Sequence, residues 1–288
     1  APRVRREGTS RHTAPASPRW RATLVAVIDL HSHLLPGIDD GPSVMADAIE
    51  MARRATEAGT ATMVCTPHMM PRLPTPPAAV HAAVDDMRDA LARAEVPLAI
   101  LPGGEIAIER LRVMDDEQLR AASLGHNGRW LLVEMPFTGW PIDLGRIIDD
   151  LEIRGFRAVL AHPERAESVQ RQPDRLRDAI GRGAVTQITA SSLTGEHGAA
   201  ADRTARALLR LGWAHLIASD AHSAEWRNPD MRPGIAAAAD EMGVEVADLA
   251  WMVDEGPGLV IAGQDVRPPR LSGGSRTPAG PRARRVTR

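Results

Sequence analysis

The stretch Thr23-Leu-Val-Ala-Val-Ile-Asp-Leu-His-Ser-His33 joins an apolar run directly to two histidines that are one residue apart. A short run of valine, isoleucine and leucine that ends at polar residues is typical of a buried parallel strand, so we expect a strand over Thr23–Leu30. Residues two apart on a strand point the same way, which makes His31 and His33 a same-side pair. The stretch therefore predicts a buried strand that delivers two imidazoles to one place.

Similar apolar runs recur along the chain and alternate with amphipathic stretches. The further predicted strands are Thr60–Thr66, Pro97–Pro102, Trp130–Met135, Arg157–Ala161, Ala184–Thr189 and His215–Ser219. The intervening predicted helices are residues 44–58, 77–94, 142–154, 173–182, 199–211 and 234–242. Strands and helices that alternate with short connections predict an α/β fold, a parallel sheet covered by helices. A doubly wound sheet and a closed barrel both satisfy this pattern.

Polar and glycine residues predict where some helices begin and end. Ser43 is expected to cap the first helix and Gly59 to end it. Gly155 and Gly212 stand where C-terminal caps of later helices are expected.

Composition and charge narrow the class of protein. The 288 residues, 43% hydrophobic and 25% charged, suit one large α/β domain or two small ones and exclude disordered, collagen-like and multi-span membrane classes. All 35 basic residues are arginines, and thirteen of them lie in residues 1–21 and 267–288. The remaining body carries 22 arginines against 36 acidic residues, which argues against a nucleic-acid surface and suits cation binding.

The ends of the chain are expected to be tails around one domain. We expect a disordered Arg-rich tail over residues 1–22, one folded domain over 23–264 and a disordered Arg/Pro-rich tail over 265–288. A secretory signal is disfavoured, because the apolar run Ala22–Ile28 is short and leads straight into Asp29 without a small-residue cleavage site. No stretch approaches the ~18 apolar residues of a membrane span, so a cytoplasmic protein is expected.

The single cysteine limits the chemistry further. One cysteine excludes an internal disulfide framework and a cysteine-rich zinc site. A cysteine-dependent phosphatase needs an arginine six positions after its cysteine, but position 71 is Pro71 and Arg72 comes one place late. Cys65 is therefore interpreted as a small strand residue.

Side chains able to bind a metal follow nearly every predicted strand. Because the carboxyl ends of parallel strands converge on one mouth, we expect these groups to meet there. Five imidazoles and four carboxylates would be costly to bury together unless divalent cations balance them. The predicted metal ligands are His31, His33, Asp40, His68, Glu105, Glu134, His162, Asp220 and His222. The other histidines, interpreted as structural or surface residues, are His12, His81, His126, His197 and His215.

The motifs that contain these residues resemble a known family. The segments Asp-Leu-His-Ser-His, Ile-Asp-Asp-Gly, Thr-Pro-His, Gly-Gly-Glu-Ile, His-Pro-Glu-Arg and Ser-Asp-Ala-His resemble those of the polymerase-and-histidinol-phosphatase (PHP) superfamily. They are most similar to the metal-dependent protein-tyrosine phosphatases of bacterial capsule and exopolysaccharide gene clusters. The resemblance covers roughly residues 27–264.

The resemblance implies a fold and a cofactor. It implies a distorted seven-stranded, TIM-like (β/α) barrel that holds three divalent metal ions, with manganese first and Fe, Co, Zn or Mg as alternatives. The nine residues above match the family's ligand positions, with Glu105 as the expected bridge. Arg165 and Arg227 match the arginines that the family places at the phosphate, whereas Arg72 is a weaker candidate at the rim. The chain departs from the family in its Arg-rich extensions and in an expected lack of aromatic residues near the mouth.

The implied reaction is hydrolysis of a phosphomonoester. A metal-bridging hydroxide would attack phosphorus in line with the leaving oxygen while Arg165 and Arg227 neutralise the phosphoryl charge. The implied partner is a phosphotyrosyl protein, an autophosphorylated bacterial tyrosine kinase that controls polysaccharide assembly.

Three alternatives stay open at this stage. The nearest is a small-molecule phosphatase of the same superfamily, such as a histidinol-phosphate phosphatase. A metal-dependent amidohydrolase is disfavoured because many of its members bridge their metals with a carbamylated lysine, and this chain has no lysine. A non-catalytic metal-binding module would usually lack a ligand or the phosphate arginines.

Overall fold

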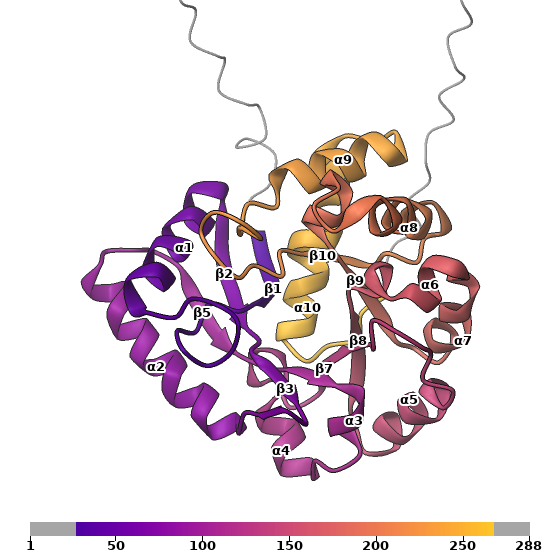
Figure 1. The fold of residues 1–288 in the computed structure, drawn as a ribbon, viewed down its shortest axis with the longest axis horizontal. Coiled ribbons are helices and arrows are strands. Elements are labelled where there is room, and N and C mark those ends of the chain that lie inside the picture. Colours follow the sequence, from indigo (N-terminus) through magenta and orange to yellow (C-terminus); the bar gives the residue numbers. More distant parts are fainter. Residues whose placement is uncertain (1–26, 268–288) are drawn as a thin grey trace, which may run out of the picture.

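The computed structural model describes residues 27–267 and has the expected α/β architecture (Figure 1). All strand pairs are parallel except the short β3–β4 hairpin. The strands are β1 (Val27–Ser32), β2 (Thr60–Cys65), β3 (His68–Met70), β4 (Leu73–Pro74), β5 (Ala99–Pro102), β6 (Glu105–Ala107), β7 (Trp130–Glu134), β8 (Arg157–Ala161), β9 (Val185–Thr189) and β10 (Leu216–Ala218). Each predicted strand region thus contains a strand, although residues 23–26, the predicted tail 1–22 and residues 268–288 of the predicted tail 265–288 lie outside the described residues.

Helices occupy the connections between these strands. The α-helices are α1 (Met45–Ala58), α2 (Pro77–Arg93), α3 (Ile108–Leu111), α4 (Asp116–Ala121), α5 (Leu144–Ile153), α6 (Glu167–Arg171), α7 (Leu176–Gly181), α8 (Gly198–Leu211), α9 (Arg232–Met242) and α10 (Gly256–Ile261). Short 3₁₀ turns are η2 (Leu124–His126), η3 (Pro163–Arg165), η4 (Pro173–Arg175), η5 (Ala190–Thr194) and η6 (Val246–Leu249), and η7 (Trp251–Glu255) is a π-helical turn before α10.

Two helix boundaries match the glycine prediction, and one cap does not. Gly59 and Gly212 take left-handed conformations with φ of 100° and 68° and end α1 and α8, as predicted. Ser43 does not cap α1: the capping position is Val44, in an extended conformation, with no side-chain hydrogen bond. The preceding loop, closed by the bond from the Gly37 amide to the Pro42 carbonyl, places Ser43 one residue too early.

The strands form two hydrogen-bonded sheets rather than the expected closed barrel. One sheet has the order β1-β2-β5 and the other the order β10-β9-β8-β7-β6-β3-β4. Two predicted strands are each followed closely by a short strand that was not predicted. β3 follows β2 and β6 follows β5, and β3 and β6 join the larger sheet. A continuous seven-stranded ladder around a barrel is therefore not what the described residues show.

Two glycines lie in the break between β5 and β6 and pass close to neighbouring residues. A side chain at Gly103 would come within 2.9 Å of Val64, and one at Gly104 within 2.5 Å of Met69. The Val64 methyl has little freedom to move aside, so the close approach favours glycine at Gly103, whereas the flexible end of Met69 could shift away from a side chain at Gly104. Glu105 begins β6 just beyond this crossing.

Hydrogen bonds just past β1 and β10 bring the two sheets together. The Asp220 amide donates to the His31 carbonyl and the His33 amide to the Ala221 carbonyl, both at 2.9 Å. Below them, buried Asp29 accepts from the backbone amide and hydroxyl of Ser219, at 3.0 and 2.5 Å. These contacts place the residues after β1 beside those after β10.

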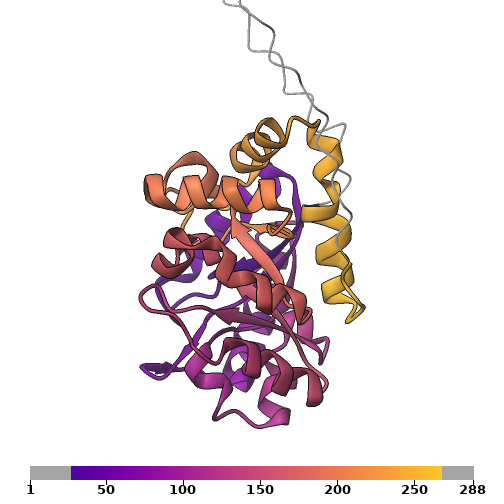
Figure 2. The same cartoon turned by 90° about the vertical axis from the view of Figure 1, so that its right-hand side faces the viewer.

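The apolar core has two parts, which lie on opposite faces of the strands. Leu132 of β7 and Val159 of β8 belong to an inner cluster, whereas their neighbours Leu131 and Leu160 belong to the larger cluster. This alternation is what a parallel sheet buried on both faces requires. The inner cluster includes Val260 of α10, and α10 stands along one side of the strands in Figure 2.

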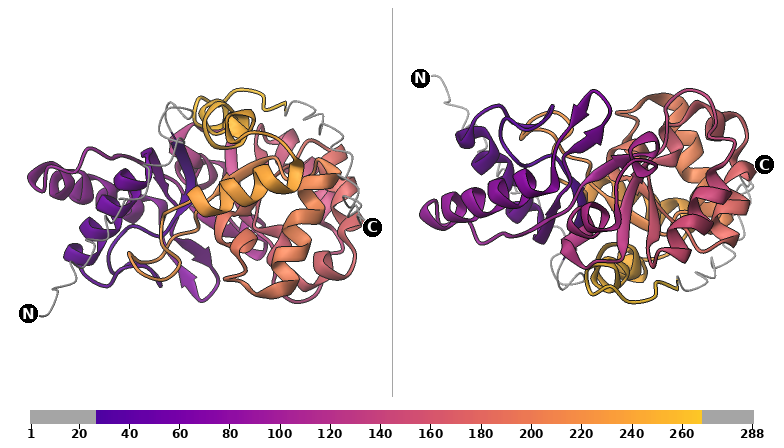
Figure 3. Two further views of the ribbon diagram at one scale, coloured as in Figure 1. Left: turned by 90° about the horizontal axis from the view of Figure 1, so that it is seen from above. Right: turned by 90° about the horizontal axis from the view of Figure 1, so that it is seen from below.

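The helices cover the strands from two flanks. Figures 1 and 3 show α1 and α2 on the flank of β1, β2 and β5, and α5 to α8 on the flank of β7 to β9. The loops that follow the strands lie between these two groups of helices. Among the described residues, no helix has the length and apolar character to cross a membrane.

Candidate metal centre

The structure brings together all nine side chains that were predicted as metal ligands. Most of them lie at or just beyond the carboxyl ends of strands, whereas His68 and Glu105 begin β3 and β6 and Asp40 lies in the loop after β1. They form four overlapping groups whose ligand atoms lie within 4.8 Å of one another. The groups are His33, Asp40, His68 and His222; His31, His33 and Glu105; His31, His162 and Asp220; and His68, Glu105 and Glu134. Shared members make this one continuous cluster, able to hold more than one cation.

Three atoms at the centre of the cluster, from His31, His33 and Glu105, are spaced like ligands of one cation, and Asp220 lies beside the same two imidazoles. The Nε2 atoms of His31 and His33 lie 3.3 Å apart. Glu105 Oε2 lies 3.4 and 3.5 Å from them, and Asp220 Oδ1 lies 3.3 and 3.4 Å from them. Tetrahedral ligands at about 2.1 Å from a metal stand about 3.4 Å apart. The donor set and its spacing therefore suit a divalent cation.

Further ligand atoms extend the cluster on either side of this centre. Asp40 Oδ1 lies 3.1 Å from His222 Nε2 and 3.4 Å from His68 Nε2. His68 Nδ1 lies 2.8 Å from Glu105 Oε2 and 3.9 Å from Glu134 Oε2. Glu105 thus has neighbours on several sides, as a bridging carboxylate would.

Four buried polar atoms in the cluster make no hydrogen bond of good geometry, although atoms of opposite charge lie close to them. They are His68 Nδ1, Glu105 Oε2, Asp220 Oδ1 and His222 Nε2. An unsatisfied buried polar atom costs about 1–3 kcal/mol, so four of them in one place need a compensating ligand. The chemistry of these atoms fits a divalent cation.

Two residues that the sequence analysis did not single out orient the histidines. Asp39 Oδ2 accepts from His33 Nδ1 at 2.6 Å, and Gln187 Oε1 accepts from His31 Nδ1 at 2.9 Å. His222 Nδ1 likewise donates to the Asp220 carbonyl at 2.9 Å. With the proton held on Nδ1, each Nε2 presents its lone pair to the cluster. For Asp39, its place beside Asp40 was a usable signal.

The backbone is held in an uncommon conformation at three site residues. His162, Asp220 and Arg227 have φ of 31°, 51° and 47°, in the left-handed region that residues other than glycine seldom adopt. Asp220 and His222 lie in the loop beyond β10, so the alternation of side chains along a strand, which pairs His31 with His33, does not apply to them. Such strain is typical of functional sites.

The charges of the cluster shift its pKa values strongly. Burial alone would raise the pKa of Glu105, but His31 and His162 hold it well below the usual range. Burial and the charge of Glu105 raise the pKa of Glu134 to about 7. Burial lowers the pKa of His68, yet Asp40 and Glu105 outweigh it and raise it to about 11. Without a metal, protons bound to the imidazoles balance the negative charge of the carboxylates. A bound cation would supply that positive charge instead and would displace these protons.

Arg165 and Arg227 both point to one edge of the cluster. Each donates to Asp220 Oδ2, Arg227 at 2.7 Å, and both side chains are largely buried. The two guanidinium groups therefore lie beside the predicted ligands, where an anion bound to the cluster would meet them. Arg72 has no such contact with the cluster and lines a neighbouring cavity.

The expectation that the mouth lacks aromatic residues is wrong. Phe137, in the loop after β7, stacks on the His162 ring with centroids 5.7 Å apart and an interplanar angle of 12°. The Arg165 guanidinium lies 4.9 Å from the centre of the Phe137 ring. The apolar run of β7 ends at Glu134, and nothing local in the sequence indicates that the loop folds back over β8.

The remaining histidines in the described residues stay outside the four ligand groups. His81 contacts His126 edge-on, and His215 accepts from the Thr186 amide at 3.0 Å. His197 is within 3.0 Å of the Ser191 hydroxyl, and burial together with Arg165 lowers its pKa to about 4. His12 lies outside the described residues.

Cys65 is confirmed as a strand residue. It is fully buried in β2, and burial raises the pKa of its thiol far above the ordinary value. A cysteine with so little thiolate at neutral pH cannot serve as the nucleophile of a phosphatase.

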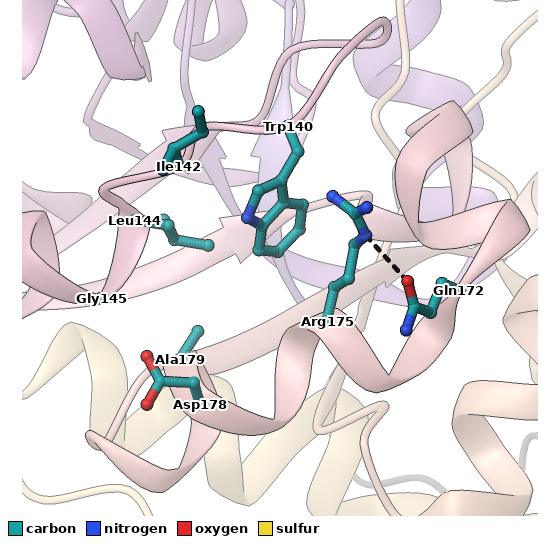
Figure 4. Close-up of a pocket in the computed structure, with 8 residues that line it drawn as sticks. All are labelled: Trp140, Ile142, Leu144, Gly145, Gln172, Arg175, Asp178 and Ala179. Carbon is teal, nitrogen blue, oxygen red and sulfur yellow. Dashed lines mark hydrogen bonds between the residues drawn. The ribbon is translucent and has the colours of Figure 1, made fainter.

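Within residues 27–267, two of the cavities include predicted ligands in their walls, and a further large one lies apart from the cluster. The first, of about 440 Å³, includes Glu134 and Phe137, and the second, of about 310 Å³, includes Asp40 and His222. The third, of about 350 Å³, lies between the β7–α5 loop and α7, where Arg175 packs beside Trp140 (Figure 4). None of its lining residues belongs to the nine predicted ligands.

Taken together, the fold and site define an α/β protein with a buried imidazole-and-carboxylate centre suited to divalent cations and flanked by two arginines. The chain belongs to the family described as capsular polysaccharide synthesis, CpsB/CapC, whose model matches residues 27–254. This confirms the resemblance drawn from the sequence motifs.

Individual relatives agree with this assignment. The tyrosine-protein phosphatase YwqE of Bacillus subtilis (strain 168) is 34% identical over 247 residues, which cover 85% of this chain and 96% of that protein. A solved structure, one of those of YwqE from Bacillus subtilis and CpsB from Streptococcus pneumoniae, described as unique metal-dependent tyrosine phosphatases, superposes with a TM-score of 0.76. It is 32% identical, and the match covers 86% of this chain and 100% of that chain.

A more distant structural likeness concerns the fold alone. The phosphotriesterase homology protein of Escherichia coli, solved with phosphate in its active site, superposes with a TM-score of 0.55 at 11% identity. The match covers 83% of this chain and 99% of that chain.

Proposed function

We propose that this chain is a metal-dependent protein-tyrosine phosphatase that acts in capsular or exopolysaccharide synthesis. The observation that carries the proposal is the cluster of nine imidazole and carboxylate side chains with two guanidinium groups at one edge. The family and the 34% identical tyrosine-protein phosphatase support the substrate class.

The nine clustered side chains would hold three divalent cations, with manganese as the first candidate and Fe, Co, Zn or Mg as alternatives. Glu105, at the centre of the cluster, would be shared between cations. Bound there, the cations would lower the pKa of water and neutralise charge on the phosphoryl group.

Arg165 and Arg227 would bind the non-bridging phosphoryl oxygens. Their planar guanidinium groups suit two-point hydrogen bonding to a phosphate, and both already lie at the cluster edge. In the hydrolysis, a water oxygen bonds to phosphorus as the bond to the tyrosyl oxygen breaks. A tyrosinate, with a pKa near ~10, leaves with little help from a general acid.

The protein substrate would be an autophosphorylated tyrosine kinase that controls polysaccharide assembly. A phosphotyrosine on a flexible segment of such a protein would have to reach an open mouth. The two cavities that border the cluster are accessible to a side chain of this kind.

The test is metal analysis combined with a phosphotyrosyl-peptide assay in added Mn, Fe, Co, Zn and Mg. We expect His162→Ala and Asp220→Ala to abolish turnover and to reduce bound metal, because each removes a ligand. Arg165→Ala should lower turnover about 10²–10³-fold while the metal content stays unchanged, because the side chain stabilises charge without binding the metal.

Arg54→Ala is the matched control, because Arg54 is an exposed arginine of α1 that pairs with Glu50. It should behave as the wild type does. Unchanged phosphatase activity in His162→Ala or Asp220→Ala would refute the assignment, and loss of metal in Arg165→Ala would make that residue structural. Faster hydrolysis of histidinol phosphate than of the phosphotyrosyl peptide would favour the small-molecule phosphatase instead.

A further inference from the structure

The two cavities at the cluster differ in what they could bind. The cavity beside Glu134 has mostly apolar walls, which include Met70, Pro71, Pro136 and Phe137. Its volume of about 440 Å³ falls within the range of about 300–1,000 Å³ found for small-molecule sites. We refer to it below as the Phe137 cavity.

The opposite cavity is acidic. It is lined by Asp47, Glu50 and Glu225 as well as the predicted ligand Asp40, with the exposed ring of Trp226 at its edge. A tyrosyl group gains negative charge on its oxygen as the ester bond breaks. Carboxylates would repel that charge. The Phe137 cavity also has two carboxylates on its wall, Glu109 and the predicted ligand Glu134, but it carries Arg72 beside them, whereas the described residues that line the acidic cavity include no arginine.

Phe137 connects its cavity to the phosphate-binding edge of the cluster. Its ring is packed on His162 and on the Arg165 guanidinium, yet 42% of the residue is exposed. An aromatic ring held in place by a predicted ligand and a phosphate arginine is ready to contact a second ring beside the phosphorus.

We propose that the Phe137 cavity binds the aromatic ring of the phosphotyrosyl side chain, with Phe137 as the residue that selects aryl over alkyl phosphomonoesters. This inference rests on the proposed phosphatase function and deepens it. The phosphoryl group lies at the cluster and the arginines, and the ring lies over Phe137 and Met70. The acidic cavity is left free of the leaving group.

The experiment compares inorganic phosphate with phenylphosphonate, in which a phenyl ring bonded to phosphorus replaces one oxygen, by calorimetric titration of the metal-loaded protein. Phe137→Ala should weaken phenylphosphonate binding about tenfold, because a stacking partner is removed. Binding of inorganic phosphate should change less than about twofold. Met70→Ala tests the opposite wall without touching Arg165 and should also weaken phenylphosphonate selectively, about threefold.

Trp226→Ala is the matched control, an exposed aromatic residue beside the other cavity, and should bind both ligands as the wild type does. Equal losses for both ligands in Phe137→Ala would overturn the inference, because the residue would then only support His162 and Arg165. A selective loss in Trp226→Ala would place the ring in the acidic cavity and would overturn it as well.

Failure of the proposed function is a separate outcome. A wild-type protein that hydrolyses no phosphotyrosyl peptide with any of the metals would refute the phosphatase assignment itself. A wild type that is active, combined with an unselective Phe137→Ala, would refute only the ring-binding site.

Discussion

At the scale of single residues, neighbouring side chains determine how the predicted ligands are oriented. His31 and His33 follow an ordinary strand pattern, but they act as a pair because Gln187 and Asp39 each hold one Nδ1 proton. Asp39 also accepts from the amides of Gly41 and His68, so one carboxylate orients a predicted ligand and fixes the loop that carries Asp40. A neutral and correctly turned imidazole is what a divalent cation requires.

His215 allows a prediction about acid stability at a residue outside the cluster. It is 7% exposed, and burial lowers its pKa from 6.5 to about 4. The unfolded chain therefore binds a proton between pH 6.5 and 4 that the folded chain does not, so this residue destabilises the fold as the pH falls through that window. We expect the unfolding free energy of the wild type to drop between pH 7 and 4.5 by about 2–3 kcal/mol more than that of His215→Asn.

Urea unfolding of both proteins at the two pH values measures this difference. Asparagine can still accept the Thr186 amide hydrogen bond that His215 Nδ1 accepts, and it does not titrate. Parallel pH dependences for the two proteins would show that His215 keeps an ordinary pKa in the folded state.

At the scale of secondary-structure elements, close backbone contacts determine how the helices pack. Gly234 lies near the start of α9, and a side chain there would come within 2.2 Å of the Ala190 carbonyl in η5. The helix and the turn thus pack backbone to backbone. Because α9 follows the loop with Arg227, its position also affects that loop.

Gly234→Ala should therefore destabilise the protein, by about 1–3 kcal/mol, because the obstructing atoms belong to the backbone and cannot turn aside. Chemical denaturation of the metal-free protein measures the loss. Gly181→Ala is the control, since Gly181 ends α7 with open space around it and no positive φ, and alanine there should be neutral or stabilising by up to about 1 kcal/mol. Equal stabilities of the two variants would show that α9 can move away from η5.

At the scale of the whole molecule, the cluster joins the two sheets. His31 and His33 come from β1 and its end, in the three-stranded sheet, whereas Glu105 and Glu134 come from the seven-stranded sheet. Between the ends of β1 and β10, few backbone hydrogen bonds connect the sheets. Cations held by ligands from both sheets would therefore add cross-links where the ladder is interrupted.

Removal of metal should lower the melting temperature. A ligand present at 100 times its Kd stabilises the folded state by about 2.7 kcal/mol, which corresponds to about 5–10 °C for a domain of this size. Calorimetry before and after chelation measures the shift, and readdition of manganese should reverse it. His162→Ala should reduce the shift, whereas His81→Ala, a helix residue outside the ligand groups, should keep it. A melting temperature that does not respond to chelation would contradict the cross-linking role.

Much of the fold class and the composition of the site could be predicted from the sequence, because both depend on local patterns. Apolar runs such as Trp130–Glu134 predict buried strands. Polar residues directly after such strands must lie together at the carboxyl edge of a parallel sheet. The break of the strand at Gly103 and Gly104 could not be predicted, since it depends on how closely β2 and β3 approach. The same holds for Phe137, whose position over His162 depends on the path of a loop.

The sequence by itself determined the alternation of strands and helices, the family and the identity of the residues that gather at the mouth. Only the tertiary structure decided that the strands divide into two sheets, and which side chains orient the histidines. Gln187 lies 156 residues from its partner His31, so no local pattern connects them. The physical reason is that hydrophobic periodicity is a short-range property, whereas hydrogen bonds between ring nitrogens and distant side chains exist only once the chain has folded.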